Sequence, residues 1–252
     1  MRFFLRLIAV AVLAASAAFG AERVSVAAAA NLTYVLDSLD AAFVRAHPEL
    51  EIAPTLGSSG NLLAQISNGA PFDVFLSADM DFPRKLIAAG GADAPSLRVF
   101  AIGKLALWTT QGGVDVSSVE SAVRSGQVRK LAIANPKTAP YGRAAMEALA
   151  KLGLTDAAQP KIVTGENITQ TAQFVSTGNA DAGFVALSLL LAPQLKGQGR
   201  WIEVPASLYS PIEQGAVLTR RGADRAAARL YLDFLAGPEA RAIFEKFGYA
   251  LP

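Results

Sequence analysis

The 252-residue sequence contains no cysteine and only one histidine, His47. The absence of thiols excludes disulfides, thiolate metal sites and cysteine nucleophiles. His47 has no second histidine to share a metal with, and we interpret it as a solvated residue. The chain also lacks the G-x-S-x-G elbow of hydrolases, the G-x-x-x-x-G-K-[ST] phosphate loop and the H-E-x-x-H zinc motif. We therefore predict a protein that is not an enzyme and that has neither a cofactor nor a protein-ligated metal.

Long apolar runs are also scarce. The run at residues 7–15 is shorter than the ~20 residues that span a bilayer. It follows a basic start with Arg2 and Arg6 and precedes the small residues Ala18 and Gly20, so residues 1–21 are interpreted as a secretory signal peptide. Removing Arg2 and Arg6 from the 23 basic residues leaves 21, equal to the number of acidic residues. The mature chain therefore has no excess charge to attract nucleic acid or anionic lipid.

Short apolar segments alternate with amphipathic helical patterns along the rest of the chain. Strand patterns occur at residues 23–30, 50–56, 73–78, 131–134 and 182–186, and each is followed by a helical pattern. This alternation predicts an α/β protein with mostly parallel sheets covered by helices on both faces. The strand pattern at 99–109 is unusually long, and we place the crossing into a second domain near residues 102–105. Domain I is then 22–103 and 206–252, and domain II is 104–205.

Four strand-to-helix turns are rich in small polar residues. They lie around Asn31, at residues 57–61, at 135–142 and at 164–168, two in each half of the chain. Ligands of open α/β sheets gather at the carboxyl ends of strands, where helix starts present unpaired N–H groups. Two facing domains would enclose a small guest, and a fully ionised tetrahedral oxyanion suits such donors because it only accepts hydrogen bonds. Asn31 is placed to cap its helix or to donate a hydrogen bond from its amide. Tyr141 either donates a hydrogen bond from its hydroxyl to the guest or fills the wall of the cleft.

Five segments together carry a more specific signal: 28–32 (AAANL), 57–60 (GSSG), 69–79 (GAPFDVFLSAD), 135–142 (NPKTAPYG) and 178–188 (GNADAGFVALS). This combination resembles the periplasmic molybdate-binding proteins of ABC importers over essentially the whole mature chain. The resemblance implies a two-domain periplasmic-binding-protein fold of type II, with the ligand cleft between the domains. It also implies a soluble, monomeric, periplasmic protein that delivers molybdate or tungstate to a permease and ATPase complex of the inner membrane.

The resemblance also implies a set of ligand contacts. Carried over position by position, they are Asn31, Ser59, Tyr141 and the backbone N–H of Ile168, with Ala30 and Ser58 beside them. Many family members have a tyrosine where this chain has Ala186. The resemblance implies that Tyr141 supplies the tyrosine here.

Other interpretations remain open at this point. The protein could bind sulfate or another tetrahedral anion, because a sequence does not give the volume of a cavity. It could be a secreted serine hydrolase that uses Ser58 or Ser59, although no base is evident. It could also be an adhesin or interaction module. A helix is predicted over 143–152, and Lys137 and Arg143, near its start, are possible anion contacts.

Overall fold

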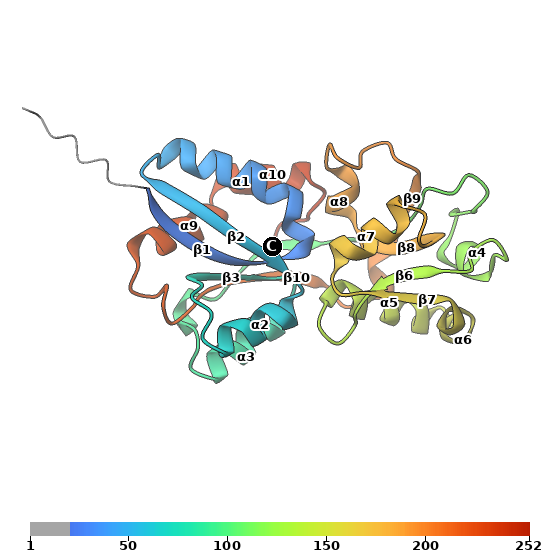
Figure 1. The fold of residues 1–252 in the computed structure, drawn as a ribbon, viewed down its shortest axis with the longest axis horizontal. Coiled ribbons are helices and arrows are strands. Elements are labelled where there is room, and N and C mark those ends of the chain that lie inside the picture. Colours follow the sequence, from blue (N-terminus) through green and yellow to red (C-terminus); the bar gives the residue numbers. More distant parts are fainter. Residues whose placement is uncertain (1–20) are drawn as a thin grey trace, which may run out of the picture.

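Two five-stranded sheets organise the protein in the computed structural model, which describes residues 21–252 (Figure 1). The proposed signal peptide at residues 1–21 falls, apart from its last residue, outside the described residues. Lobe I is built on the sheet β2-β1-β3-β10-β4, and lobe II on the sheet β7-β6-β8-β5-β9. The strands of lobe I are β1 (Glu22–Ala29), β2 (Leu50–Gly57), β3 (Val74–Ser77), β4 (Arg98–Gly103) and β10 (Ile212–Leu218). Those of lobe II are β5 (Leu105–Thr109), β6 (Leu131–Ala134), β7 (Ile162–Gly165), β8 (Ala182–Ala186) and β9 (Arg200–Glu203).

Helices cover both faces of each sheet, because most strands are apolar on both sides. In lobe I, α1 (Thr33–Ala46), α9 (Ala226–Leu235) and α10 (Pro238–Lys246) pack on one face, and α2 (Ser59–Ser67) and α3 (Asp81–Ala88) on the other. In lobe II, α5 (Pro140–Lys151) and α7 (Ile168–Ser176) pack against the strands from opposite sides, with α4 (Val119–Arg124), α6 (Thr155–Ala158) and α8 (Leu187–Leu191) around them.

Each sheet has two parallel and two antiparallel strand pairings, which is fewer parallel pairings than we expected. β1 is parallel to β2 and β3, and β6 is parallel to β7 and β8. Every antiparallel pairing involves β10 or β5. These are the two strands that bring the chain into a lobe from the other lobe. They enter from the side where the parallel strands end, and they therefore run in the opposite direction.

The chain crosses between the lobes at Lys104. β4 ends at Gly103 and β5 begins at Leu105, so the single long strand predicted over 99–109 is in fact two strands in different sheets. A side chain at position 103 would overlap the hydroxyl of Tyr141 and approach Gln214 Nε2 to 3.0 Å, so only glycine fits this crossing. The chain returns to lobe I through residues 204–211 and continues into β10.

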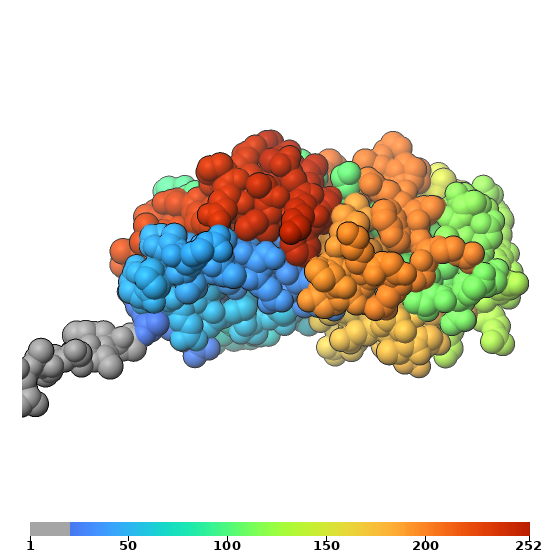
Figure 2. Space-filling model, turned by 90° about the horizontal axis from the view of Figure 1, so that it is seen from above, coloured from blue at the N-terminus to red at the C-terminus, as the bar shows by residue number. Residues whose placement is uncertain are grey.

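The two lobes meet along one seam. In the view from above, the N- and C-terminal segments of lobe I lie directly against the segment around α8 (Figure 2). Among residues 21–252, no helix combines the length and the hydropathy needed to cross a membrane.

Candidate binding site between the lobes

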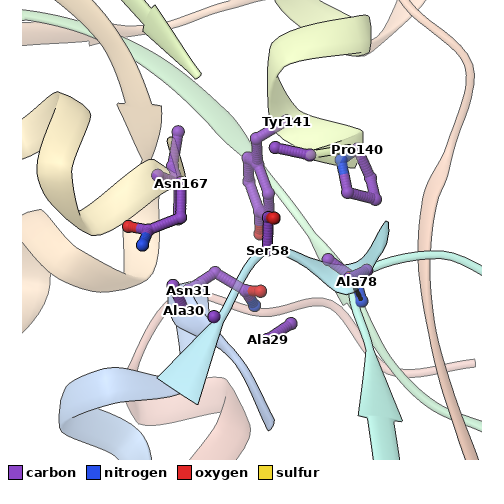
Figure 3. A pocket seen from close by; sticks show the side chains of 12 residues that line it. Ala29, Ala30, Asn31, Ser58, Ala78, Pro140, Tyr141 and Asn167 are labelled. Carbon is purple, nitrogen blue, oxygen red and sulfur yellow. Dashed lines mark hydrogen bonds between the residues drawn. The ribbon is translucent and has the colours of Figure 1, made fainter. Parts of the chain in front are cut away.

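A small cavity lies between the lobes, where strands of both sheets end (Figure 3). It is small, with about 190 Å³ of free space between its lining atoms, part of which is open to solvent. Its lining contains no charged side chain: lobe I contributes Ala29, Ala30, Asn31, Gly57, Ser58, Ser59 and Ala78, and lobe II contributes Ala139, Pro140, Tyr141, Asn167 and Ile168. All six residues that the sequence predicted lie in this lining. A cavity of this size and polarity suits a small, hydrogen-bonding guest.

A hydrogen bond from Ala78 orients the Ser59 hydroxyl so that it can donate to a guest. It is the first residue of α2, and its side chain is buried. The Ser59 hydroxyl oxygen accepts a hydrogen bond from the backbone N–H of Ala78, at 2.9 Å. Because that contact uses the oxygen as acceptor, the hydroxyl hydrogen of Ser59 remains available to a guest.

Three buried polar atoms of the lining have no hydrogen-bond partner within the protein. They are Asn31 Oδ1, Ser58 Oγ and the hydroxyl of Tyr141, among five such side-chain atoms in the described part of the chain. Each unpaired buried group costs about 1–3 kcal/mol. The two hydroxyls can donate, so their convergence on one cavity indicates a guest that accepts hydrogen bonds. Asn31 Oδ1 can only accept, and a fully ionised oxyanion does not provide its partner. Ser58 comes from lobe I and Tyr141 from lobe II, and in Figure 3 the Tyr141 ring points toward Ser58.

Tyr141 remains a donor at any physiological pH. Burial raises the pKa of its hydroxyl well above the ordinary value of 10.0, with smaller contributions from Tyr249 and Tyr209. The proton therefore stays on the oxygen, and the group can donate to an anion but carries no charge itself.

The side-chain amide of Asn31 is not free to donate a hydrogen bond to a guest. Its Nδ2 donates to Gln214 Oε1 at 2.8 Å and to the hydroxyl of Tyr249 at 2.9 Å, which uses both amide hydrogens. This orientation is fixed, since Gln214 Nε2 donates to the carbonyl of Ile212 at 3.1 Å and Tyr249 donates to the Asn31 carbonyl at 3.0 Å. The sequence suggested that this amide caps the helix or donates to the guest; in the structure it anchors the loop to β10 and the C-terminal segment.

The start of α7 forms the lobe II wall of the cavity. Asn167 caps this helix by accepting a hydrogen bond from Gln170 N–H at 3.0 Å. Ile168 is the first helical residue, so its N–H has no partner within the helix. Asn167 was not among the predicted site residues, although an asparagine directly before a helical pattern is a capping signal.

The chain matches the family model described as bacterial extracellular solute-binding protein over residues 24–250. It belongs to that family. The resemblance inferred from the sequence is thereby confirmed, and so is the two-lobed binding-protein fold.

Individual relatives of this solute-binding protein carry more specific names. Two are molybdate-binding proteins ModA: one from Azotobacter vinelandii, 44% identical over 95% of this chain and 94% of its own length, and one from Rhodobacter capsulatus, 43% identical over 91% and 88%. A solved structure, the periplasmic molybdate-binding protein of Azotobacter vinelandii, superposes with a TM-score of 0.85 at 38% identity, over 91% of this chain and 99% of that one.

Other residues of the solute-binding protein that the sequence singled out lie outside the cavity. Helix α5 begins at Pro140 and not at Arg143 as predicted, because the fixed φ of proline suits the first helical position. Arg143 pairs with Asp79 at 2.8 Å, and Lys137 is exposed.

Asp73 is fully buried and accepts from Ser25 N–H at 2.8 Å, beside the guanidinium groups of Arg221 and Arg225. In the described range, no group of three metal-ligating side chains gathers.

Proposed function

We propose that this extracellular solute-binding protein captures molybdate, and also tungstate, in the cavity between its lobes. The observation that carries the proposal is the pair of unpaired hydroxyl groups, Ser58 and Tyr141, which reach an uncharged cavity from opposite lobes. The names of its relatives support the same ligand. We further propose that the protein acts as a monomer in the periplasm and delivers the anion to a permease and ATPase complex of an ABC importer in the inner membrane.

The donors at this site suit a fully ionised oxyanion. The hydroxyls of Ser58, Ser59 and Tyr141 and the N–H groups at the starts of α2 and α7 can replace the water around its oxygens. Without such bonds, burial of a dianion would be prohibitive. An anion that retains a proton at neutral pH would place a donor against these donors and bind less well. Asn31 contributes through its backbone N–H in this scheme, because its side-chain amide is already bonded.

Titration calorimetry of the purified protein with molybdate, tungstate, sulfate and phosphate tests the proposal. We expect tight binding of molybdate and tungstate and much weaker binding of the other two anions. Molybdate at a thousandfold excess over its Kd should also stabilise the fold by about 4 kcal/mol. Tight binding of sulfate with none of molybdate would identify the protein as a sulfate binder. The absence of binding to every oxyanion would refute the proposal altogether.

A further inference from the structure

Several polar contacts join the lobes around the rim of the cavity. The Gly60 N–H of lobe I donates to the carbonyl of Thr138 of lobe II at 2.9 Å. The Thr169 hydroxyl of lobe II donates to the carbonyl of Ala30 at 2.8 Å. The structure therefore describes a form in which the lobes are in contact over the site.

One of these contacts is an ion pair. Arg143 Nη2 of lobe II donates to Asp79 Oδ2 of lobe I at 2.8 Å, and Asp81 lies at 3.7 Å from the same nitrogen. Within residues 21–252, no ion pair outside this group joins the two lobes. Both partners lie next to the site in their own lobe. Asp79 directly follows Ala78 of the lining in lobe I, and Arg143 lies two residues after Tyr141 in lobe II.

Asp79 is held in place by lobe I whether or not Arg143 is present. Its side chain is 7% exposed, and its Oδ1 accepts from the Phe82 N–H and the Ser77 hydroxyl, both at 3.1 Å. Only the contact to Oδ2 crosses between the lobes. When the lobes separate, Arg143 moves away with lobe II, and this oxygen must return to water.

We propose that the Arg143–Asp79 ion pair sets the affinity of the site by stabilising the closed form, without contact between Arg143 and the ligand. The inference rests on the proposed function, in which the lobes close over an oxyanion. A charge-assisted hydrogen bond that exists only in the closed form raises the closed fraction of the ligand-free protein. The observed Kd falls in proportion, because it equals the intrinsic Kd divided by the closed fraction.

The pair also has an electrostatic role. The carboxylate of Asp79 is directly adjacent to the lining of an anion site, and on its own it would repel the guest. The guanidinium of Arg143 neutralises it from outside the cavity, so that the uncharged lining is not opposed by a nearby negative charge.

The first test compares Arg143→Met, Arg143→Lys and Arg84→Met by calorimetry with molybdate. Arg84 is an exposed residue of α3 on the same rim, with no ion pair in the described structure, and its substitution removes the same charge. We expect Arg143→Met to raise the Kd roughly three- to tenfold, Arg143→Lys to restore part of the affinity, and Arg84→Met to change nothing. Equal values for Arg143→Met and Arg84→Met would overturn the proposal.

A second readout does not need a ligand. The chain has no cysteine, so spin labels at Ala64→Cys on α2 and Ala150→Cys on α5, both exposed positions, report the distance between the lobes. In the ligand-free protein we expect a short and a long distance, with the short one reduced in Arg143→Met but kept in Arg84→Met. An unchanged distribution would overturn the proposal. If no oxyanion binds to the wild type, the proposed function fails, while this measurement still decides on the closing contact.

A double-mutant cycle separates the pair from each residue's other contacts. Asp79→Asn removes the negative charge and keeps an oxygen that can accept from the Phe82 N–H. In that background, we expect Arg143→Met to change the Kd by less than about twofold, because coupled residues have non-additive effects. Fully additive effects would show that the two side chains act independently, contrary to the proposal.

Discussion

Hydroxyl groups, and not charged side chains, face the guest space between the lobes. An empty site lined by lysine or arginine would leave a buried charge without compensation, which is far more costly than an unpaired hydroxyl. Ser58 and Tyr141 instead remain neutral, and Ser59 already has a partner in Ala78. Under the proposed function, such residues would let the lobes close around a charged guest without a permanent electrostatic penalty in the empty site.

Replacing Tyr141 with phenylalanine should separate binding from stability. The change removes only a hydroxyl that has no partner in the protein. We expect the affinity for molybdate to fall by about 1–3 kcal/mol, and the ligand-free protein to be as stable as the wild type or slightly more stable. Calorimetry and urea unfolding without ligand give the two values. A variant with wild-type affinity and reduced stability would show that the hydroxyl serves the fold and not the ligand.

Ser59→Ala should weaken molybdate binding by about 1–3 kcal/mol, since it removes one buried donor from the cavity. It also leaves the Ala78 N–H without its acceptor, so the ligand-free protein should be slightly destabilised as well. The matched control is Ser67→Ala, at an exposed position of the same helix. Calorimetry on both variants is decisive: equal affinities in the two would remove Ser59 from the site.

Local patterns in the sequence predicted the polar turns that meet at the cavity, because each turn stands where a strand gives way to a helix. The family resemblance supplied six of the residues that line it, but neither showed how every side chain is used. The orientation of the Asn31 amide depends on Gln214 and Tyr249, which are 183 and 218 positions away in the chain. The pairing of Arg143 with Asp79 likewise spans 64 positions. A local pattern contains no information about partners at such separations.

At the scale of elements, the site is built from helix starts. α2 and α7 begin directly at the cavity, and α5 begins there with Pro140. The alternation of strand and helix patterns predicted these turns, since helices that follow parallel strands begin at the same edge of the sheet. The start of α5 was placed three residues late, because the Asn-Pro-Lys-Thr-Ala-Pro stretch reads as a rigid loop until the second proline is recognised as the first helical residue.

Gly60→Ala should hinder closure and spare the fold. A Cβ at this position in α2 would lie 3.0 Å from the Cα of Thr138 in the other lobe, and 3.2 Å from the ring of Phe82, which lies in the same lobe and must shift slightly. We expect binding of molybdate to weaken by about 1–3 kcal/mol through this steric conflict. The ligand-free protein should keep its stability, because alanine favours a helix more than glycine by up to about 1 kcal/mol. Calorimetry and urea unfolding measure both quantities, and unchanged affinity would mean that the lobes need not approach this closely.

The packing of α1 against α9 should make stability depend on pH. Burial raises the pKa of Asp40 from 3.8 to about 6, against the lowering effect of a hydrogen bond from Tyr231, and the charge of Asp37 raises it further. The folded protein therefore holds this proton more tightly than the unfolded chain. The resulting stabilisation is complete below pH 4 and is lost as the pH rises through 6.

Asp40→Asn should therefore be more favourable at pH 8 than at pH 4. The change that it causes in the free energy of unfolding should be more positive at pH 8, by on the order of 1 kcal/mol. Urea unfolding at the two pH values measures this difference. Asp37→Asn, at the exposed neighbouring position, removes only the smaller coulombic contribution to the raised pKa of Asp40 and should show a smaller difference. A pH-independent effect of Asp40→Asn would mean that the carboxyl group titrates alike in both states.

At the scale of the whole molecule, two sheets connected by two crossings create one site between them. The repeated strand–helix pattern predicted the α/β class, and the unusual length of the strand pattern at 99–109 predicted a passage into a second domain near residues 102–105. The antiparallel placement of β5 and β10 was not predictable from local patterns, because it depends on which lobe each strand enters from. The size of the cavity also follows only from how the lobes meet.

Anomalous diffraction at the molybdenum edge, from crystals of the protein grown with molybdate, locates the bound anion. We expect one strong molybdenum peak in the cavity between the lobes, with the oxygens of the anion within hydrogen-bonding distance of Ser59 Oγ, the Tyr141 hydroxyl and the Ile168 N–H. A peak held elsewhere by lysine or arginine side chains, or no peak at all under saturating molybdate, would contradict the proposed function.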